Sequence, residues 1–531
     1  MAHISTLKGS SIPIVFFISI IIYLLIGTNI VSNVYAAPPI AFTHGVASGD
    51  VTSTTAVLWV RSTLSSLPVD RKDPVIVEVS TNPDFKRVDF RQAFQTQAQN
   101  DFTAKALATD LQPGQLYYYR WRLGSSVSEV GTFKTAPSPN TPTTVKFAWT
   151  GDSDVSKING APAFNNWESL DAAAAEGLDF FIYLGDTIYS DFRAGGRLPD
   201  AQTLEEFRQL YKDSRNVPAL HNLLLATSVY PLWDDHEVRN DWDAQTVDPF
   251  FYQIGAKAFD EYMPIQSNAI PLDPGCSGPP QFRVFHWGSE VDLIIIDARS
   301  CRSASVEQQC NNDLAPTLPS SIRSSLPSFF PPQLPAGCLD AINDPTRTML
   351  GDTQKTLLKH ALQSSAAKFK FVVSPVSIQQ TYIRPYDGWE GYAAERTELL
   401  NFIRDNNIRN VIFLTTDLHE NLMNEVFIDR FTNPAPVAYE FITGPIATVT
   451  DEKLILGSFP PNIGPIAVAA KQNILSLVGV DCRHLNVYSY GSVNVDPSSG
   501  TVTVSLKDDS GNIIHDQVNP AIQCIKTIAG S

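Results

Sequence analysis

The chain has 531 residues, of which 43% are hydrophobic and 18% charged, and this composition is typical of a globular protein rather than a disordered one. Its length predicts two or more domains. With 55 acidic residues against 39 basic ones the formal net charge is −16, which argues against a protein held on DNA or RNA by a basic face. Phosphorylated substrates are not excluded, because bound cations can reverse the local sign of the charge.

The N-terminus has the pattern of a secretory signal peptide over residues 1–36. Lys8 precedes an apolar stretch from Ile12 to Ile30, and we expect cleavage after Ala36. The alternative is an uncleaved membrane anchor, since the stretch approaches the ~20 residues that span a bilayer. Either way, the rest of the chain is expected to be secreted or held at the cell surface. No second apolar stretch of that length follows, so no membrane span is expected after signal removal.

Residues 40–137 are predicted to form an all-β, fibronectin-like sandwich. The stretches 55–60, 75–79 and 116–121 are rich in β-branched and aromatic residues, with turn residues between them. The stretch 137–142 is rich in proline and is typical of a linker, so we place a domain boundary there.

From Val145 the pattern changes to strand, helix, strand, which predicts an α/β domain over residues 143–525. A helix expected over 165–176 separates strands expected over 145–150 and 180–184, and this order implies a parallel pair. Further strands are expected over 291–297, 369–373 and 411–414, and further helices over 353–362 and 396–405.

The six cysteines suit an oxidising compartment, where an even count favours disulfides. Four of them lie within residues 271–345, a stretch rich in Pro and Ser with little periodicity. We predict that most of this stretch is a disulfide-stapled insertion, since loops of this length are seldom structureless in a compact domain. The spacings do not resemble pairs of zinc ligands and do not determine the pairing, although Cys482 with Cys524 is one expected pair.

Short acidic motifs follow the expected strands. Asp152 and Asp186 each come two residues after a strand and directly after a glycine, and the motifs 234–237 and 417–419 repeat the pattern downstream. Because the carboxyl ends of parallel strands meet at one edge of a sheet, these side chains are expected to converge. Uncompensated charges would be costly there, so the pattern predicts a metal site.

A pair of cations suits phosphoester hydrolysis, because it polarises the phosphoryl oxygens, offsets charge in the transition state and generates hydroxide near neutral pH. Hard oxygen ligands suit calcium, manganese, magnesium or ferric iron, and imidazole adds affinity for transition metals. The candidate ligands are Asp152, Asp186, Asp235, Asp417 and His419, with Asp186 the candidate to bridge two metals.

Two further residues of these motifs have chemistry that suits the site. Tyr189 can add a phenolate ligand, which ferric iron favours, and His236 can stabilise the phosphoryl group or protonate the leaving oxygen. Structural interpretations compete with these roles, because a carboxylate after a strand often caps a helix and a lone His or Tyr often only packs. Asp234 and Glu237 are expected to be surface charges or ion-pair partners. The joint occurrence at four strand ends favours a site.

At these residues the chain resembles the PhoD-type alkaline phosphatases, a branch of the calcineurin-like metallophosphoesterases. The resemblance covers nearly all of the chain after the signal segment. The matching segments are 42–50, 57–61, 184–189, 233–238, 297–299, 349–354, 387–392 and 417–419. It implies that the N-terminal sandwich is followed by a calcineurin-like metallophosphoesterase domain, with mixed β-sheets flanked by helices.

The resemblance also implies roles for individual residues. The family acts on phosphomonoesters and phosphodiesters outside the cytoplasm with iron and calcium, which implies two or more metal ions. By this likeness Asp186, Tyr189, Asp417 and His419 are metal ligands. Asp235 stands where related enzymes place a metal-binding Asn.

His236 stands where related enzymes place a catalytic His, so His236 and Asp235 are the candidate catalytic residues. Asn240 is a weaker candidate near the metal or the phosphate, and Arg299 is expected to be structural.

This chain departs from the family pattern at the first motif. Asp152 occupies a position where the family commonly has a cysteine ligand, although the wider metallophosphoesterase group uses a carboxylate there. A carboxylate is a harder ligand, so manganese, magnesium or a calcium-only site stay open as alternatives to iron. Asp154 lies where the wider group often has His, so it is a candidate metal ligand or only a neighbour of the metal site. Thr416 replaces the usual Gly before Asp417 and is expected to narrow access.

The leading hypothesis is a secreted, metal-dependent phosphoesterase that hydrolyses phosphomonoesters, phosphodiesters or both by metal-activated hydroxide attack, for phosphate acquisition. Its expected partners are small phosphate esters and not nucleic acid. One alternative is a phospholipase D-like phosphodiesterase acting on phospholipids. A second is a non-catalytic cell-surface binding protein on the same scaffold. The oligomeric state is open.

Overall fold

The computed structural model describes residues 41–63, 73–266, 271–325, 329–330 and 333–530. The signal peptide predicted over residues 1–36 lies outside these ranges. No helix within the described ranges is both long enough and apolar enough to cross a membrane.

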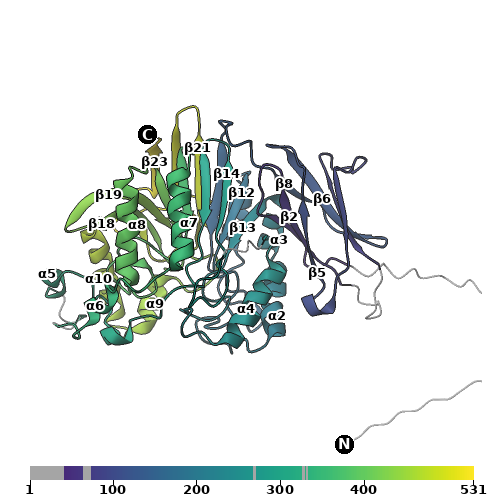
Figure 1. Ribbon diagram of the computed structural model, residues 1–531. Helices are drawn as coiled ribbons and strands as arrows, with labels where there is room; N and C mark the ends of the chain where they lie inside the picture. The colour runs from purple at the N-terminus through teal and green to yellow at the C-terminus, as the bar shows by residue number, and fades with distance from the viewer. Residues whose placement is uncertain (1–40, 64–72, 267–270, 326–328, 331–332, 531) are drawn as a thin grey trace, which may run out of the picture. The chain divides into compact units, whose positions relative to one another are not determined.

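Two large β-sheets form the centre of the fold (Figure 1). Within the described residues, nine strands form the first sheet, in the order β23-β22-β21-β9-β12-β13-β1-β2-β5. In that order they are β23 (Ile525–Ala529), β22 (Thr501–Asp508), β21 (Ser489–Asp496), β9 (Val145–Thr150), β12 (Phe180–Leu184), β13 (Ser228–Leu232), β1 (Val46–Gly49), β2 (Ala56–Arg61) and β5 (Thr103–Ala108). Strands β9, β12 and β13 are parallel, as the strand–helix–strand pattern predicted.

Seven strands of the same described part form the second sheet, in the order β14-β15-β16-β17-β19-β18-β20. In that order they are β14 (Arg283–Trp287), β15 (Val291–Ile295), β16 (Phe369–Val373), β17 (Val411–Thr415), β19 (Asn433–Ile442), β18 (Asn421–Asp429) and β20 (Cys482–His484). The core of this sheet, β15-β16-β17-β19, is parallel. The strands expected over 291–297, 369–373 and 411–414 are therefore confirmed within a few residues.

Aromatic side chains fill the space between the two sheets. Phe180 in β12 packs against Phe147 in β9 with ring centroids 4.6 Å apart, and against Trp287 in β14 at the same separation. Phe147 also meets Phe371 in β16 edge-on at 5.1 Å. Strand β12 is buried on both faces, which explains why its five residues are all apolar or aromatic. These aromatic contacts pack the central strands of the two sheets against one another.

Helices cover the outer faces of both sheets. Figure 1 shows α7 and α8 lying over the seven-stranded sheet, where Leu358, Leu399 and Leu400 pack on Ile294 and Val372. The helices are α1 (Glu168–Ala174), α2 (Leu204–Arg215), α3 (Pro218–Ala226), α4 (Pro249–Tyr262), α5 (Ser320–Arg323), α6 (Cys338–Ile342), α7 (Gly351–Ser364), α8 (Ala393–Asp405), α9 (Asp451–Ser458) and α10 (Gly464–Leu477). The helices predicted over 165–176, 353–362 and 396–405 correspond to α1, α7 and α8.

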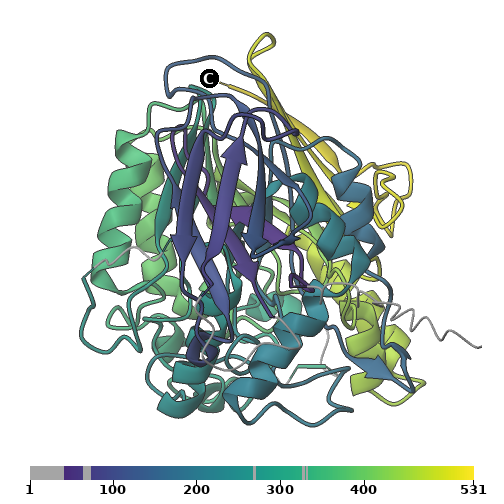
Figure 2. The same cartoon turned by 90° about the vertical axis from the view of Figure 1, so that its right-hand side faces the viewer.

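The N-terminal region is a β-sandwich whose strands face the viewer in Figure 2. One of its layers, β1-β2-β5, continues into the first large sheet. Its separate layer contains β4 (Phe90–Phe94), β3 (Val75–Ser80), β6 (Leu116–Leu123), β7 (Ser126–Val127) and β8 (Gly131–Lys134). Val77 and Trp121 in this layer pack against Leu58 and Val60 in β2. The fold is therefore α/β with a β-rich N-terminal region, and contacts join residues 40–531 in one compact unit.

The prediction of an insertion over residues 271–345 needs correction. Strands β14 and β15 lie inside this stretch and belong to the seven-stranded sheet, because β15 is an apolar strand that pairs with both β14 and β16. The irregular parts are residues 271–282, before β14, and the segment after β15. Disulfides join Cys276 to Cys301 and Cys310 to Cys338, and the expected pair Cys482–Cys524 is confirmed.

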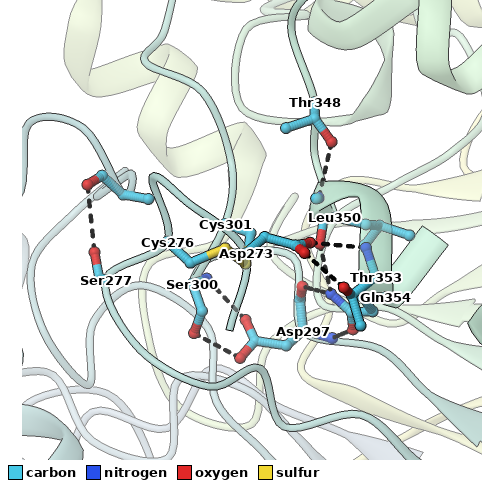
Figure 3. The surroundings of a disulfide bond; sticks show 12 residues. Asp273, Cys276, Ser277, Asp297, Ser300, Cys301, Thr348, Leu350, Thr353 and Gln354 are labelled. Carbon is cyan, nitrogen blue, oxygen red and sulfur yellow. Dashed lines mark hydrogen bonds between the residues drawn. A yellow bond between two sulfur atoms is a disulfide. The ribbon is translucent and has the colours of Figure 1, made fainter. Parts of the chain in front are cut away.

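The disulfide between Cys276 and Cys301 helps to fix the loop that follows β15 (Figure 3). Asp297, in the same loop, accepts hydrogen bonds from the backbone and hydroxyl of Ser300 at 2.9 and 2.7 Å. Gln354 in α7 accepts from the Asp297 backbone at 2.7 Å and donates to its carbonyl at 2.8 Å. Arg299 lies in this loop. The backbone that carries its side chain is therefore fixed by contacts with α7 and by its connection to β15.

The carboxylate of Glu176, which lies just after α1, accepts hydrogen bonds from side chains of the first sheet. Tyr490 Oη, Ser492 Oγ and Lys507 Nζ donate to it at 2.7, 2.8 and 2.6 Å. Although burial acts to raise its pKa, these bonds lower the pKa of Glu176 from 4.5 to about 2. A depressed carboxyl pKa means that the folded state gains stability while Glu176 is ionised.

We expect Glu176→Gln to lower the free energy of unfolding by about 1–2 kcal/mol at pH 7. The deficit should be complete above pH 4.5 and shrink as the pH falls towards 2, because protonation removes the same interaction from the wild type. Urea unfolding at pH 7 and pH 3 measures both values. Glu205→Gln, at a side chain that is 64% exposed, is the matched control and should change stability by less than about 0.5 kcal/mol. A deficit that is equal at both pH values would contradict this account.

Candidate metal centre

The four acidic motifs converge where strands of both sheets end. Asp152 follows β9, Asp186 follows β12 and Asp235 follows β13 in the first sheet, whereas Asp417 and His419 follow β17 in the second. Among the described residues, three groups have potential ligand atoms within 4.8 Å of one another, namely Asp152, Asp186 and His419; Asp186, Asp235 and His236; and Asp234, Asp235 and Asp417. Asp186 belongs to two groups and Asp235 to two, so the groups form one continuous cluster.

The backbone at these strand ends adopts an unusual conformation. Asp152, Asp186, Asp417 and His419 have φ values of 60°, 48°, 69° and 54°, in the left-handed region that non-glycine residues rarely enter. Such residues persist where surrounding contacts over-determine them, and they concentrate at functional sites. One such contact is the hydrogen bond from Thr416 Oγ1 to the Leu184 carbonyl, at 2.9 Å, which ties the second sheet to the first.

The glycines before the two leading aspartates are required by close approach. A Cβ atom on Gly151 would clash with the Leu184 carbonyl at the end of β12. A Cβ atom on Gly185, whose φ is 73°, would lie 2.7 Å from the Cβ of Asp234. The Gly-Asp pattern therefore allows adjacent strand ends to bring their carboxylates together.

Asp152 and Asp186 are buried in this cluster. The exposed fraction is 0% for Asp152 and 1% for Asp186. Within the described structure neither carboxylate oxygen of Asp152 has a hydrogen-bond partner. Burial, and then the charge of Asp234 for Asp152 and Asp235 for Asp186, raises the pKa of each carboxyl group well above 3.8. Two buried carboxylates with too few donors are the environment that a bound cation would stabilise.

Tyr189 and His419 lie together beside this pair. Tyr189 Oη is 3.1 Å from His419 Nε2, and the Tyr189 ring stacks on the His236 ring at 4.1 Å between centroids. Burial, and then Asp186, raises the pKa of the Tyr189 phenol well above its usual value. Burial also lowers the pKa of His419 to about 4, which keeps its imidazole neutral and able to act as a ligand.

His236 lies at the junction of two carboxylates. Its Nδ1 is 2.7 Å from Asp191 Oδ1, and its Nε2 is 4.0 Å from Asp186 Oδ2. Burial acts to lower its pKa, but Asp235 and Asp191 raise the pKa of His236 to about 9. Asp191 was not predicted from the sequence. It follows Tyr189 by two residues, and no local pattern indicates that it orients an imidazole encoded 45 residues later.

Arg299 is the main partner of the acidic cluster on its other side. It donates to Asp387 with two nitrogens, at 2.7 and 2.8 Å, and its Nε donates to Asp234. Its Nη2 is also 4.0 Å from Asp235 and 3.8 Å from Asp417. The Arg299 side chain is fully buried. It therefore has the structural role that was expected and also an electrostatic one, because its charge offsets those of the buried carboxylates. Asp387 is a second residue that sequence reasoning did not identify, although it lies in a segment that carried the family resemblance.

The expectation that Asp234 and Glu237 are surface charges is wrong. Their exposed fractions are 1% and 0%. Asp234 is an ion-pair partner of Arg299, which agrees with the other half of the expectation. Glu237 accepts from the backbone and hydroxyl of Thr187 at 2.6 Å and from the Asp234 backbone at 2.9 Å. It therefore ties the motif after β13 to the motif after β12.

The two residues predicted as weaker candidates lie at the edge of the cluster. Asp154 accepts hydrogen bonds from the Ser156 and Ala194 backbones, so its carboxylate is occupied locally, and the three ligand groups in the described residues do not include it. Asn240 donates its backbone N–H to Asp191 at 2.8 Å and lines the cavity next to the cluster. This cavity has a volume of about 510 Å³ and also exposes Asp186, Asp235, His236, Asp417 and His419.

We expect Arg299→Lys to destabilise the fold by about 3–5 kcal/mol, because a lysine cannot reproduce the fork that contacts Asp387 and Asp234 and leaves carboxylates buried and unpaired. Thermal unfolding by circular dichroism measures the change. Arg404→Lys is the matched control, since Arg404 is 44% exposed and pairs only with its neighbour Asp405 among the described residues. Equal melting temperatures for the two variants would show that Arg299 does not compensate the cluster.

Comparison with known proteins identifies the family of this chain. The family described as PhoD-like phosphatase matches residues 148–506, and the PhoD-like phosphatase N-terminal domain matches residues 30–137. Alkaline phosphatase D of Bacillus subtilis (strain 168) is 28% identical over 436 residues, which are 75% of this chain and 68% of that protein.

Two solved structures share the fold. A structure of PhoD matches with a TM-score of 0.71 and 22% identity over 93% of this chain and 90% of its own. A purple acid phosphatase from yellow lupin (Lupinus luteus) seeds matches with a TM-score of 0.56 and 12% identity, over 93% of this chain and 75% of its own. These likenesses support the predicted fold class. The chain belongs to the PhoD-like phosphatase family and is a phosphatase.

Proposed function

We propose that this phosphatase is a metal-dependent hydrolase of phosphomonoesters and phosphodiesters that acts outside the cytoplasm in phosphate acquisition. The observation that carries the proposal is Asp152, whose two buried oxygens have no hydrogen-bond partner in the described structure although ligand atoms of Asp186 and His419 lie within 4.8 Å. Small phosphate esters are the proposed substrates. A non-catalytic binding protein is no longer proposed, because the chain is a phosphatase.

The donor set fits two neighbouring cations. Asp152, Asp186 and His419, with Tyr189 beside His419, would hold one cation. Asp235 and Asp417, which share a ligand group, would hold the other, and Asp186 would contribute to both because it also shares a group with Asp235. When bound, the metal ions supply charge compensation, polarisation of the phosphoryl oxygens and an activated water near neutral pH. Iron with calcium is the proposed pair. The carboxylate at position 152 keeps manganese and magnesium as alternatives.

The residues around this donor set have separate roles in the proposal. His236 protonates the leaving ester oxygen from Nε2, since Asp191 occupies Nδ1 and supports the protonated imidazole. Arg299 is a positioning residue that holds Asp234 and Asp387. The three disulfides support an oxidising compartment for the mature protein.

We expect Asp186→Ala to lose bound metal and to lower kcat/KM more than about a hundredfold, because it removes a ligand shared by both groups. Metal content is measured by mass spectrometry on protein purified without chelator, and activity with p-nitrophenyl phosphate and bis-p-nitrophenyl phosphate. Asp352→Ala, at a side chain that is 93% exposed, is the control and should retain both metal and activity. Full activity of metal-free wild-type protein would refute the metal dependence.

The identity of the cation beside Tyr189 has its own test. If ferric iron is bound there, a phenolate from Tyr189 produces a visible absorption band by charge transfer to the iron, and Tyr189→Phe abolishes it. Tyr118→Phe, in β6 of the N-terminal sandwich, should leave the band intact. If the wild-type protein is colourless and contains manganese or magnesium, that metal replaces iron in the proposal. The proposed hydrolytic function is unaffected by this outcome.

A further inference from the structure

The cavity beside the acidic cluster has an apolar part that the chemistry of phosphate transfer does not require. In addition to the carboxylates, its lining includes Leu314, Ile383, Leu454, Ile455, Phe459 and Ile474. Leu418, between the predicted ligands Asp417 and His419, lines the same cavity and connects the two parts. With a volume of about 510 Å³, the cavity is in the range that encloses a small molecule.

Helix α10 presents two alanines and an isoleucine to this space. Ala467, Ala470 and Ile474 all line the cavity, and their spacing of three and four residues places them on one helix face. Larger residues at 467 and 470 would fill the volume, so the two alanines keep it open. Leu454 and Ile455 of α9, which packs against α10, form a neighbouring part of the wall.

The charged groups next to α9 and α10 pair with one another, whereas Glu307 and Arg384 line the cavity from other segments. Lys471 Nζ lies 2.9 Å from Glu420 Oε1 and 2.9 Å from Asp451 Oδ2, and its side chain is only 11% exposed. A second anionic group on a substrate would meet two carboxylates for one ammonium at this point. An uncharged group would bury apolar surface against α9 and α10 instead.

We infer that the apolar part of the cavity binds the ester group of the substrate, and that the preferred substrates are phosphate esters with an uncharged alkyl or aryl group. The inference rests on the proposed function, since it requires the phosphoryl group to lie at the carboxylate cluster. It adds a specificity pocket, built from α9, α10 and the loops of Leu314 and Ile383, to the proposed reaction centre.

A series of n-alkyl phosphates from ethyl to octyl tests the inference, because their leaving groups differ in length and hardly in basicity. We expect kcat/KM to rise about two- to fourfold for each added methylene until the cavity is filled. Non-hydrolysable n-alkyl phosphonates should show the same trend in their inhibition constants, which removes the leaving-group chemistry from the comparison. A flat series in both measurements would overturn the inference.

Ala470→Leu fills the proposed pocket and should lower the octyl-to-ethyl ratio of kcat/KM at least about tenfold. Ala469→Leu is the matched control, since Ala469 is exposed on the same helix and does not line the cavity, and it should keep the wild-type ratio. If Ala470→Leu fails to fold, Leu454→Ser, at a partly buried residue, should lower the ratio, whereas Leu456→Ser, at an exposed one, should not.

The outcomes separate this inference from the proposed function. If the metal-loaded protein hydrolyses no ester in the series, including ethyl phosphate, the proposed function fails and the inference with it. If all esters are hydrolysed at one rate, and Ala470→Leu and Ala469→Leu behave alike, the function stands and the pocket is refuted. Hydrolysis of phosphatidylcholine vesicles without any trend among soluble esters would also overturn the inference, in favour of a membrane substrate.

Discussion

The burial of Asp152, Asp186, Asp234 and Asp235 beside the half-buried Asp417 is the constraint on which the structure of the centre depends. A carboxylate removed from water costs several kcal/mol unless an opposite charge or several donors compensate it. Arg299 provides part of this compensation from one side, and His236, with a pKa raised to about 9, provides part from the other. Neither of them makes a hydrogen bond to Asp152, whose carboxylate oxygens have no hydrogen-bond partner in the described structure. The proposed cations would compensate the negative charge of the Asp152 carboxylate, which no side chain of the described structure contacts by a hydrogen bond.

Two sheets are needed to assemble this cluster, because no single sheet edge supplies all its members. The first sheet contributes the residues after β9, β12 and β13, and the second contributes those after β17. The aromatic layer of Phe147, Phe180 and Phe371 holds the sheets together behind the strand ends. Positive φ angles at Asp186 and Asp417 turn the chain sharply towards the cluster, a strain that the packed strands can sustain. The rigid core thus stabilises an arrangement of like charges that a flexible loop could not hold.

The residues of the site that could be predicted are those marked by a local pattern in the sequence. Apolar strands followed by Gly-Asp identify Asp152 and Asp186, because the pattern of burial and the glycine both act locally. The roles of Asp191 and Asp387 could not be predicted, since their partners His236 and Arg299 lie 45 and 88 residues away in sequence. The sequence predicts Asp234 and Glu237 as surface charges or ion-pair partners, and it does not reveal that tertiary packing buries both. The same long-range pairing places β1, β2 and β5 in the first large sheet, which the local pattern of a separate sandwich does not indicate.

The proposed chemistry and the proposed specificity arise from different kinds of structure. The candidate ligands extend from strand ends whose positions are fixed by the core, so that a change in any of them alters charge in a buried site. The apolar wall comes from α9, α10, the irregular segment after β15, which contributes Leu314, and the loop after β16, which contributes Ile383. Substitutions in this wall change volume and apolar area and leave the buried charges in place. The fold can therefore vary the ester group that it accepts while it keeps one arrangement of carboxylates, and the alanines of α10 that line the cavity are positions at which a larger side chain would reduce its volume.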